Sequence, residues 1–266
     1  MVEIIIDLKK SLEQNASDYF EKAKKAKGKI ETIKKVIEDY KERLTKLEKE
    51  QIQIQEEKAA KEKRVVKWYE RYRWFITSEG FLAIGGRDAG SNEEVVKKHM
   101  DKNDLVFHTD AAGSPFFILK RNPVLGITPL GSKITERSIQ EVADAAYIFS
   151  KSFKAGVSGI NSFYVNPEQI STTPPTGEYL EKGSFIINGK KNIVVPRFNL
   201  AIGITKDDSI MCAPANAVKK NCEKYIELTQ SRNEKPSDVA KRIKKKIGGD
   251  MDSIIRALPA GNIGVK

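Results

Sequence analysis

Apolar and small residues recur at alternating steps of three and four along the N-terminal quarter of the chain. The series starts at Ala23 and Ala26 and includes the residues that we expect to form a coiled-coil seam: Ile30, Ile33, Ile37, Tyr40, Leu44, Leu47 and Ile54. Lys, Glu and Gln fill most of the positions between them, and residues 17–67 contain no proline. A period of 3.5 residues kept over this length predicts a long helix in a left-handed coiled coil.

A lone helix of this kind would leave its seam in water. Because such helices gain most of their stability by packing their apolar face, the predicted helix needs a partner helix. No second heptad run follows later in the chain. We expect the partner to come from another copy of the chain, from another protein, or from an N-terminal half that this sequence lacks. The alternative is a charged helix that lies against its own domain.

The pattern changes near residue 67, where heptads give way to short apolar runs bounded by turn residues. These runs predict strands over residues 81–84, 104–109, 115–119, 200–204 and 209–213. Residues 184–194 predict a hairpin, because Asn188-Gly189 suits a type I′ turn. We therefore divide the chain into a coiled-coil arm, residues 1–66, and a globular domain, residues 67–266.

Helices are expected between and after these strands. The capping box Ser91–Glu94 predicts a short helix, and Thr135 or Ser138 can cap a longer one that continues to Phe153. Two more helices are expected over residues 237–247 and 252–258. The fold class that follows is α+β, a mainly antiparallel sheet with flanking helices, preceded by the long N-terminal coiled-coil helix.

The composition predicts where the protein is located and what kind of partner it binds. The 266 residues are 39% hydrophobic, enough for a core, but no run approaches the roughly 18 apolar residues of a membrane span. The first residues lack the order of a signal peptide, so we expect a cytoplasmic protein without membrane contact. Lys and Arg number 47 against 36 Asp and Glu, a net charge of +11. This excess favours a polyanionic partner, of which nucleic acid is the commonest in the cytoplasm.

Residues for metal or acid–base chemistry are scarce. Cys212 and Cys222 are the only cysteines and stand ten apart, which fits neither a disulfide framework nor a zinc cage. His99 and His108 are the only histidines. We therefore expect no metal, no cofactor and no catalytic residue, and a binding protein in place of an enzyme.

Basic residues near aromatic rings, at a glycine-rich loop and at loop tips are the candidates for binding RNA. Lys67, Arg71 and Arg73 alternate with the rings of residues 68–75, a composition typical of surfaces that stack bases and neutralise phosphates, although such rings more often form core. The residues that we expect to bind RNA are Arg71, Arg73, Arg87, His108, Lys120, Arg121, Lys154, Lys190, Lys191 and Arg197.

Two other functions fit parts of the sequence. The glycine-rich loop over residues 85–92 carries Arg87 at a predicted helix start, where backbone N–H groups can hold a phosphate, and His108 stands before Asp110. Together they suggest a nucleotide-dependent enzyme, whereas a tight turn and a structural histidine explain the same residues. The seam alone would suit a purely structural coiled-coil dimerisation module, which the excess charge opposes.

Residues 67–89, with Asn92-Glu93 and Val96-Lys97-Lys98 behind them, resemble the start of the NFACT-R domain. That domain belongs to the NFACT family, the nuclear export mediator factor and ribosome quality control complex subunit 2 proteins, in its archaeal and eukaryotic form. The similarity continues through the segments 107–110, 153–156, 165–169, 174–180 and 183–192. It therefore covers nearly the whole chain.

The resemblance implies a specific role in translation. Family members engage the large ribosomal subunit that carries a stalled peptidyl-tRNA, recruit aminoacyl-tRNA and promote C-terminal tailing of the nascent chain. It implies tRNA and large-subunit rRNA as partners of the NFACT-R domain and ribosomal stalk-base proteins as partners of the coiled coil. The NFACT-N domain and the helix-hairpin-helix region of the family are missing from this sequence, so we expect binding without tailing.

Overall fold

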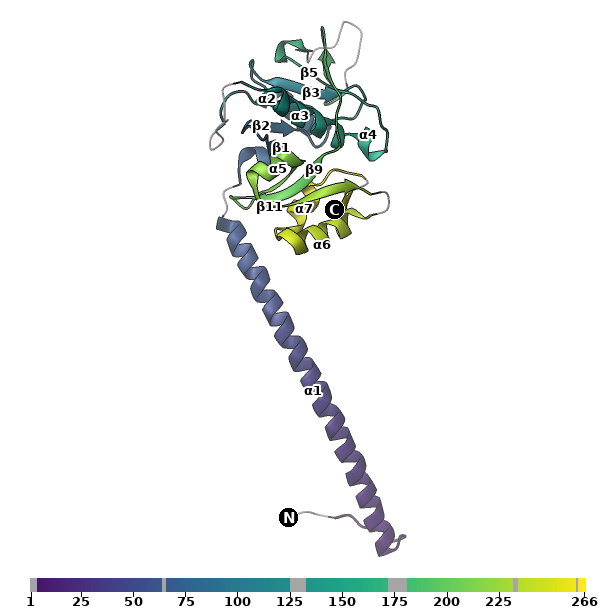
Figure 1. Cartoon of the computed structure of the whole chain (residues 1–266). Coiled ribbons are helices and arrows are strands. Elements are labelled where there is room, and N and C mark those ends of the chain that lie inside the picture. The colour runs from purple at the N-terminus through teal and green to yellow at the C-terminus, as the bar shows by residue number, and fades with distance from the viewer. Residues whose placement is uncertain (1–3, 64–65, 125–132, 172–180, 232–233, 262) are drawn as a thin grey trace. The chain divides into compact units, whose positions relative to one another are not determined.

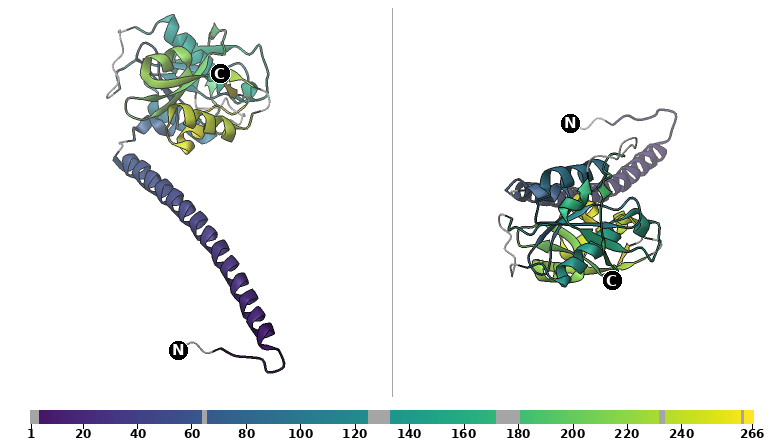
Figure 2. Two further views of the ribbon diagram at one scale, coloured as in Figure 1. Left: turned by 60° about the horizontal axis from the view of Figure 1, so that its bottom comes forward. Right: turned by 90° about the horizontal axis from the view of Figure 1, so that it is seen from above.

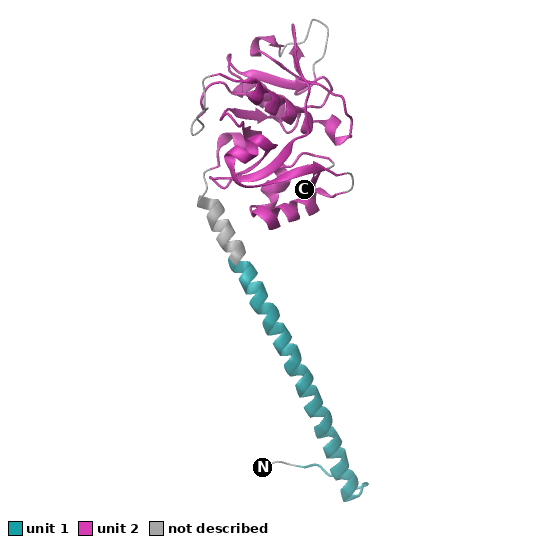
Figure 3. Ribbon diagram, in the orientation of Figure 1, with its two compact units in different colours: residues 1–65 teal, residues 66–266 magenta. Residues whose placement is uncertain are grey.

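The computed structural model describes residues 4–63, 66–124, 133–171, 181–231, 234–261 and 263–266, with residues 53–63 described by their backbone alone. It divides into two compact units, residues 1–65 and residues 66–266 (Figure 3). Each unit is described by itself below. The predicted Ile54 side chain and the segment 174–180 lie outside the described part.

Unit 1 is built on a single helix, α1 (Leu12–Lys63), of 52 residues (Figure 1). Its start is held by Asn15, whose side chain accepts from Asp7 N at 2.9 Å and donates to Asp7 O at 3.0 Å. The predicted long helix is confirmed. The described seam residues from Ile30 to Leu47 are between 48% and 60% exposed, so the apolar stripe is uncovered in the single chain.

Unit 2 contains a six-stranded antiparallel sheet in the order β1-β2-β4-β3-β5-β8. Its strands are β1 (Arg73–Ile76), β2 (Leu82–Gly85), β3 (Leu105–Thr109), β4 (Phe117–Leu119), β5 (Ser162–Val165) and β8 (Asn192–Val194). The 3-10 helix η1 (Trp68–Arg71) precedes β1, α2 (Ala89–His99) joins β2 to β3, and α3 (Glu136–Ile148) and α4 (Lys151–Lys154) lead to β5. Of the candidate RNA-binding residues, Arg73 lies on β1 and His108 on β3 of this sheet.

A second antiparallel sheet follows in the chain, with the order β10-β9-β11-β12. Its strands are β9 (Leu200–Thr205), β10 (Ile210–Pro214), β11 (Cys222–Gln230) and β12 (Ile263–Val265). Helix α5 (Ala215–Asn221) joins β10 to β11, and α6 (Pro236–Ile247) and α7 (Met251–Ala257) precede β12. A short pair, β6 (Ile170–Ser171) and β7 (Ile186–Ile187), follows the 3-10 helix η2 (Pro167–Gln169).

The second sheet has a core on each face, as the alternation of side chains along a strand requires. Ala201 of β9 and Met211 of β10 face the core that contains α3, α5 and the first sheet. Ile202 of β9 and Cys212 of β10 face the other core, which α6 and α7 cover. The views of Figures 1 and 2 show α6 and α7 on one side of this sheet and α3 on the other.

The α+β class and most of the predicted strands and helices are confirmed. One hairpin is correct: β9 pairs with β10 across Lys206–Asp208, and Asp208 takes the positive φ of 55° that the turn needs. The other hairpin is wrong, because β7 pairs with β6 whereas residues 192–194 form β8 and pair with β5. Gly189 alone has a positive φ there, which a type I′ turn does not allow.

Two helix predictions need correction at their ends. Asp88 caps α2 through Ser91 N at 2.8 Å, so Ser91 is the third residue of the helix and not its cap. The helix that Thr135 caps ends at Ile148, and Ser150 caps a separate short helix, α4. The longest strand, β11, was not predicted, because its outer face carries Glu and Lys and shows little apolar alternation.

Candidate nucleic-acid interface

Exposure separates the ten candidate RNA-binding residues into two groups. Six are exposed on unit 2: Arg71, Arg121, Lys154, Lys190, Lys191 and Arg197. Four are engaged within the fold: Arg73, Arg87, His108 and Lys120. A side chain must reach solvent to contact a phosphate, so the two groups are considered in turn.

Lys120 follows β4 and points into the protein. Its ammonium lies 2.6 Å from carboxylate oxygens of both Asp101 and Asp104 and donates to His99 O at 2.8 Å. The side chain of Lys120 is 7% exposed and that of Asp104 is not exposed. This lysine is neutralised and buried, so we remove it from the RNA-binding set; its role is to hold the loop 101–104 against β4.

Arg73 begins β1 and lies under the surface. Its guanidinium carbon is 4.3 Å from the centroid of the Phe149 ring, and its Nη1 is buried without a hydrogen-bond partner in the described structure. Burial lowers the pKa of Arg73 to about 10. Arg73 therefore supplies positive charge from below the surface and does not itself contact a partner.

Arg87 is saturated by the protein backbone. Its Nε donates to Arg71 O at 3.1 Å, its Nη1 to Arg256 O at 2.5 Å and its Nη2 to Tyr72 O at 2.8 Å. Burial, together with the neighbouring guanidinium groups of Arg73 and Arg256, lowers the pKa of Arg87 to about 10. The residue fastens the loop before α2 to η1 and to α7.

The glycine-rich loop does not present free N–H groups to a phosphate. The carboxylate of Asp88 occupies the start of α2, and its hydrogen bonds from Ser91 lower the pKa of Asp88. A Cβ on Gly86 would stand 2.6 Å from Asn92 N, so this glycine permits close packing of the loop on the helix. The loop is thus a tight turn that leads into a capped helix, which is the structural alternative to a phosphate site that the sequence left open.

Arg71 and Arg256 lie exposed beside Arg87. With Tyr72, Asp88, Ser91 and Glu94 these arginines line a shallow pocket of about 340 Å³. Glu94 accepts from Arg71 Nη2 at 2.6 Å and from Lys98 Nζ at 3.0 Å, so one carboxylate serves two cations. Arg256, which comes from α7 far along the chain, was not predicted from the sequence.

The aromatic cluster over residues 68–75 is mostly core, with one exception. Tyr69, Tyr72 and Phe75 are each 1% exposed, whereas Trp68 is 43% exposed. The His99 ring stacks on Trp68 with centroids 4.5 Å apart and an interplanar angle of 19°. Trp68 therefore presents an indole that is supported from behind and reaches solvent.

His108 of β3 and Lys191, which comes just before β8, both lie beside the ring of Phe163 on β5, in the interior of the first sheet. The ring nitrogens of His108 lie 2.7 Å from Thr109 O and 3.1 Å from Ser114 O, and burial lowers its pKa. Lys191 Nζ stands 4.3 Å from the Phe163 ring centroid. Backbone carbonyl oxygens hold the His108 ring, so of these two side chains Lys191 is the one that reaches outward, with Asp110 at 3.6 Å.

His108 and Arg87 share no contact among the described residues. Backbone carbonyl oxygens engage both side chains: Arg87 donates to those of Arg71, Tyr72 and Arg256, and the His108 ring lies beside those of Thr109 and Ser114.

The other exposed cations occupy separate positions. Lys190 lies in the loop that Gln169 holds through Lys190 O at 3.1 Å, next to Lys191. Arg197 follows β8 and donates its backbone N–H to Asp144 at 2.8 Å. Arg121 follows Lys120, and Lys154 ends α4. Lys190 with Lys191, and Arg71 with Arg256, are thus two of the places where exposed cations gather.

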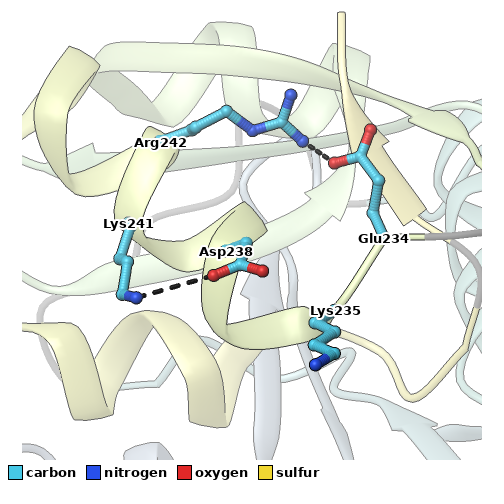
Figure 4. A pocket seen from close by; sticks show the side chains of 5 residues that line it. All are labelled: Glu234, Lys235, Asp238, Lys241 and Arg242. Carbon is cyan, nitrogen blue, oxygen red and sulfur yellow. Dashed lines mark ion pairs between the residues drawn. The ribbon is translucent and has the colours of Figure 1, made fainter.

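A pocket at the start of α6 is charged but internally paired. It encloses about 440 Å³ and is lined by Glu234, Lys235, Asp238, Lys241 and Arg242. Figure 4 shows Arg242 turned toward Glu234 and Lys241 toward Asp238, whose oxygen is 3.5 Å from Lys241 Nζ. These two carboxylates each pair with a separate cation, so Lys235 is the one lining cation of this pocket for which the described structure shows no ion pair.

Three further observations bear on the chemistry available. Within the described ranges, no group of three or more His, Cys, Asp and Glu side chains is arranged to hold a metal ion. Burial raises the pKa of both Cys212 and Cys222 to about 12, so neither thiol is activated. Among the helices that the structure describes, none has the length and hydropathy that crossing a bilayer requires.

Known proteins resemble this chain in sequence. Residues 71–189 match the NFACT protein RNA binding domain. The archaeal Rqc2 homolog aRqcH of Methanocaldococcus jannaschii is 37% identical over 202 residues, 73% of this chain and 29% of that protein. The ribosome quality control complex subunit NEMF of Homo sapiens is 34% identical over 188 residues, 69% of this chain and 16% of that protein. The chain thus spans less than a third of either relative.

A solved structure of the C-terminal part of the fibronectin/fibrinogen-binding protein from Streptococcus suis overlays on 48% of this chain and 46% of its own. The TM-score is 0.38 and the sequence identity 17%. Nothing about the fold or function of this chain is inferred from a structural similarity this low.

Proposed function

The chain belongs to the NFACT family, and from this premise we propose that residues 67–266 bind RNA as part of ribosome-associated quality control. The match of residues 71–189 to an RNA binding domain carries the proposal. The exposed cations of unit 2 support it, since Arg71, Arg256, Lys190 and Lys191 gather at two places on its surface. Cations that reach solvent supply the phosphate contacts on which RNA affinity rests.

The RNA partners in this proposal are tRNA and large-subunit rRNA. The human relative is named a ribosome quality control complex subunit and the archaeal one an Rqc2 homolog, and the resemblance of the sequence implies a large subunit with a stalled peptidyl-tRNA. This part of the protein binds and does not itself perform C-terminal tailing, which it supports within the intact factor. The site of action is the cytoplasm, where translating ribosomes are found.

Residues 1–66 act in this proposal as a coiled-coil arm that reaches ribosomal stalk-base proteins. The uncovered seam from Ile30 to Leu47 supports a partner helix, supplied by the N-terminal half of the intact protein or by a second copy. Light scattering of the chain measures its mass directly. A dimer that Leu44→Glu converts to a monomer would identify self-pairing, and a monomer at all concentrations would assign the partner helix to another segment.

The test of RNA binding is a titration of tRNA against salt concentration. Neutralising about six phosphates predicts a slope of about −5 in log affinity against log salt. Replacing both Lys190 and Lys191 by Gln should reduce the slope by one to two, while Arg137→Gln serves as a control that removes one exposed cation outside both clusters. A flat salt response of the unaltered chain would overturn the proposal.

A further inference from the structure

We propose that Trp68 and the pocket between Arg71 and Arg256 bind one unpaired nucleotide of RNA, with the base stacked on the indole and the phosphate held by the two guanidinium groups. The inference rests on the proposed RNA-binding function and names the part of the RNA that this site takes. Its basis is a concentration of positive charge beside an exposed aromatic ring, both within unit 2.

The pocket holds more positive than negative charge. Three arginines, Arg71, Arg87 and Arg256, line it against two carboxylates, those of Asp88 and Glu94, and Arg73 lies close enough to act on Arg87 electrostatically. None of the described carboxylates lies within 4.0 Å of the guanidinium nitrogens of Arg73, Arg87 or Arg256. Arg73 and Arg87 are largely withdrawn from water, and the partners of Arg87 are neutral carbonyl oxygens. Charge in such surroundings is screened less than charge in water, so an anion entering the pocket gains more than it would at an open lysine.

The pocket arginines are also positioned to receive an anion. Arg256 Nη2 donates only weakly to Arg71 O, at 3.3 Å, which leaves other guanidinium donors for a ligand. Arg71 is paired with Glu94, but that carboxylate is shared with Lys98. A phosphate can therefore take over Arg71 while Glu94 keeps its second cation, and guanidinium forks suit phosphate oxygens.

The aromatic platform adjoins this pocket through Tyr72. Tyr72 is one of the residues that line the pocket. Its ring centroid lies 6.5 Å from that of Trp68 and 5.1 Å from the guanidinium carbon of Arg71. His99 stacks behind Trp68, and burial lowers the pKa of His99, so the supporting ring is neutral near pH 7. The 43% of Trp68 that remains exposed offers a flat apolar area to a base.

This arrangement selects an unpaired nucleotide over a duplex. A base that stacks on a side chain must leave its neighbours in the strand, and single-stranded loops, bulges and ends allow this at low cost. An A-form duplex exposes phosphates and 2′-hydroxyl groups but not base faces. The pocket by itself would accept either form, and Trp68 supplies the preference.

The fluorescence of Trp68 provides a direct assay in the full chain. The other tryptophan, Trp74, is 9% exposed and packs in the core, so quenching by a ligand reports on Trp68. We expect adenosine 5′-monophosphate to quench at lower concentration than adenosine, because only the nucleotide fills both parts of the site. Single-stranded RNA should bind about 5- to 150-fold more tightly than a duplex of the same length, the factor that stacking of one base at about 1–3 kcal/mol gives.

Variants test each part separately. Trp68→Leu should abolish the quenching and weaken single-stranded RNA binding by about tenfold, and Arg256→Gln should weaken it several-fold. Glu94→Gln should strengthen binding, because it releases Arg71 from its competitor, a gain that a purely structural role of this carboxylate would not produce. Arg137→Gln is the matched control and should leave all these values unchanged.

The outcomes separate this inference from the proposed function. If the unaltered chain fails to bind any RNA, the RNA-binding function itself is refuted. If the chain binds RNA with a steep salt dependence but Trp68→Leu and Arg256→Gln bind as tightly as the unaltered chain, the nucleotide site is refuted and RNA binding stands. Weaker binding by Glu94→Gln, with folding intact by circular dichroism, also contradicts the site.

Discussion

Lys120→Met tests whether this lysine stabilises the fold or contacts RNA. The substitution keeps the length of the side chain but removes the ammonium, which lies 2.6 Å from Asp101 and from Asp104. The Asp104 side chain has no exposed surface, so its charge would remain buried without a cation. We expect the free energy of unfolding to fall and RNA affinity to stay the same.

The expected decrease in the free energy of unfolding of Lys120→Met depends on the contacts that Asp104 keeps. Removing one partner of a buried ion pair costs about 3–5 kcal/mol. Asp104 would keep two backbone donors, Asp101 N at 2.8 Å and Arg121 N at 3.0 Å, so we expect the lower end of this range, about 3 kcal/mol. The double variant Lys120→Met with Asp104→Asn should recover part of the loss, because no uncompensated charge is then left buried.

Urea denaturation followed by the fluorescence of buried Trp74 measures the loss. Lys190→Met is the matched control, since this lysine is exposed: its stability should change by less than about 0.5 kcal/mol while its RNA affinity falls. A Lys120→Met protein that loses less than about 1 kcal/mol, or that binds RNA more weakly while keeping its stability, would refute the structural role.

Three further predictions concern single sites. Burial raises the pKa of Asp144 to about 6, so the folded protein binds this proton more tightly than the unfolded chain does. The free energy of unfolding should therefore fall as pH rises from about 4 to 6. Urea denaturation at several pH values should show that Asp144→Asn removes about 2–3 kcal/mol of this fall. Gly183→Ala should cost about 1–3 kcal/mol in the same assay, because φ is +79° and the new Cβ would stand 2.7 Å from Ala89 Cα. Cys212 and Cys222, with pKa values raised to about 12 by burial, should react with iodoacetamide at pH 8 only after unfolding.

Each of these has a contradicting result. A pH profile of Asp144→Asn that is parallel to that of the unaltered chain would show that this carboxyl titrates normally. An unchanged midpoint for Gly183→Ala would mean that the turn rearranges freely. Rapid labelling of either thiol in the folded protein would place it at the surface.

Features set by neighbours in sequence could be predicted without the structure. The heptad spacing identified α1, because the period of a helix is a local property of the chain. The β9–β10 hairpin and α6 were likewise predicted from alternation and helical periodicity close to a turn or an end signal. The hairpin at residues 184–194 failed because the pairing partners of a strand are chosen by the whole sheet, and β5 competes successfully for β8.

Tertiary structure alone decided which Lys and Arg side chains can reach a partner in solvent. Lys120 and Lys190 are equivalent in sequence terms, yet Asp104 buries and neutralises the first while the second stays exposed. Arg87 is held by the carbonyl of Arg256, 169 residues away, a contact that no local pattern encodes. Sequence alone therefore determined the long helix, the α+β class and the basic character of the protein. Only the folded chain decided which charges remain free, because desolvation and pairing depend on atoms that folding brings together from distant segments.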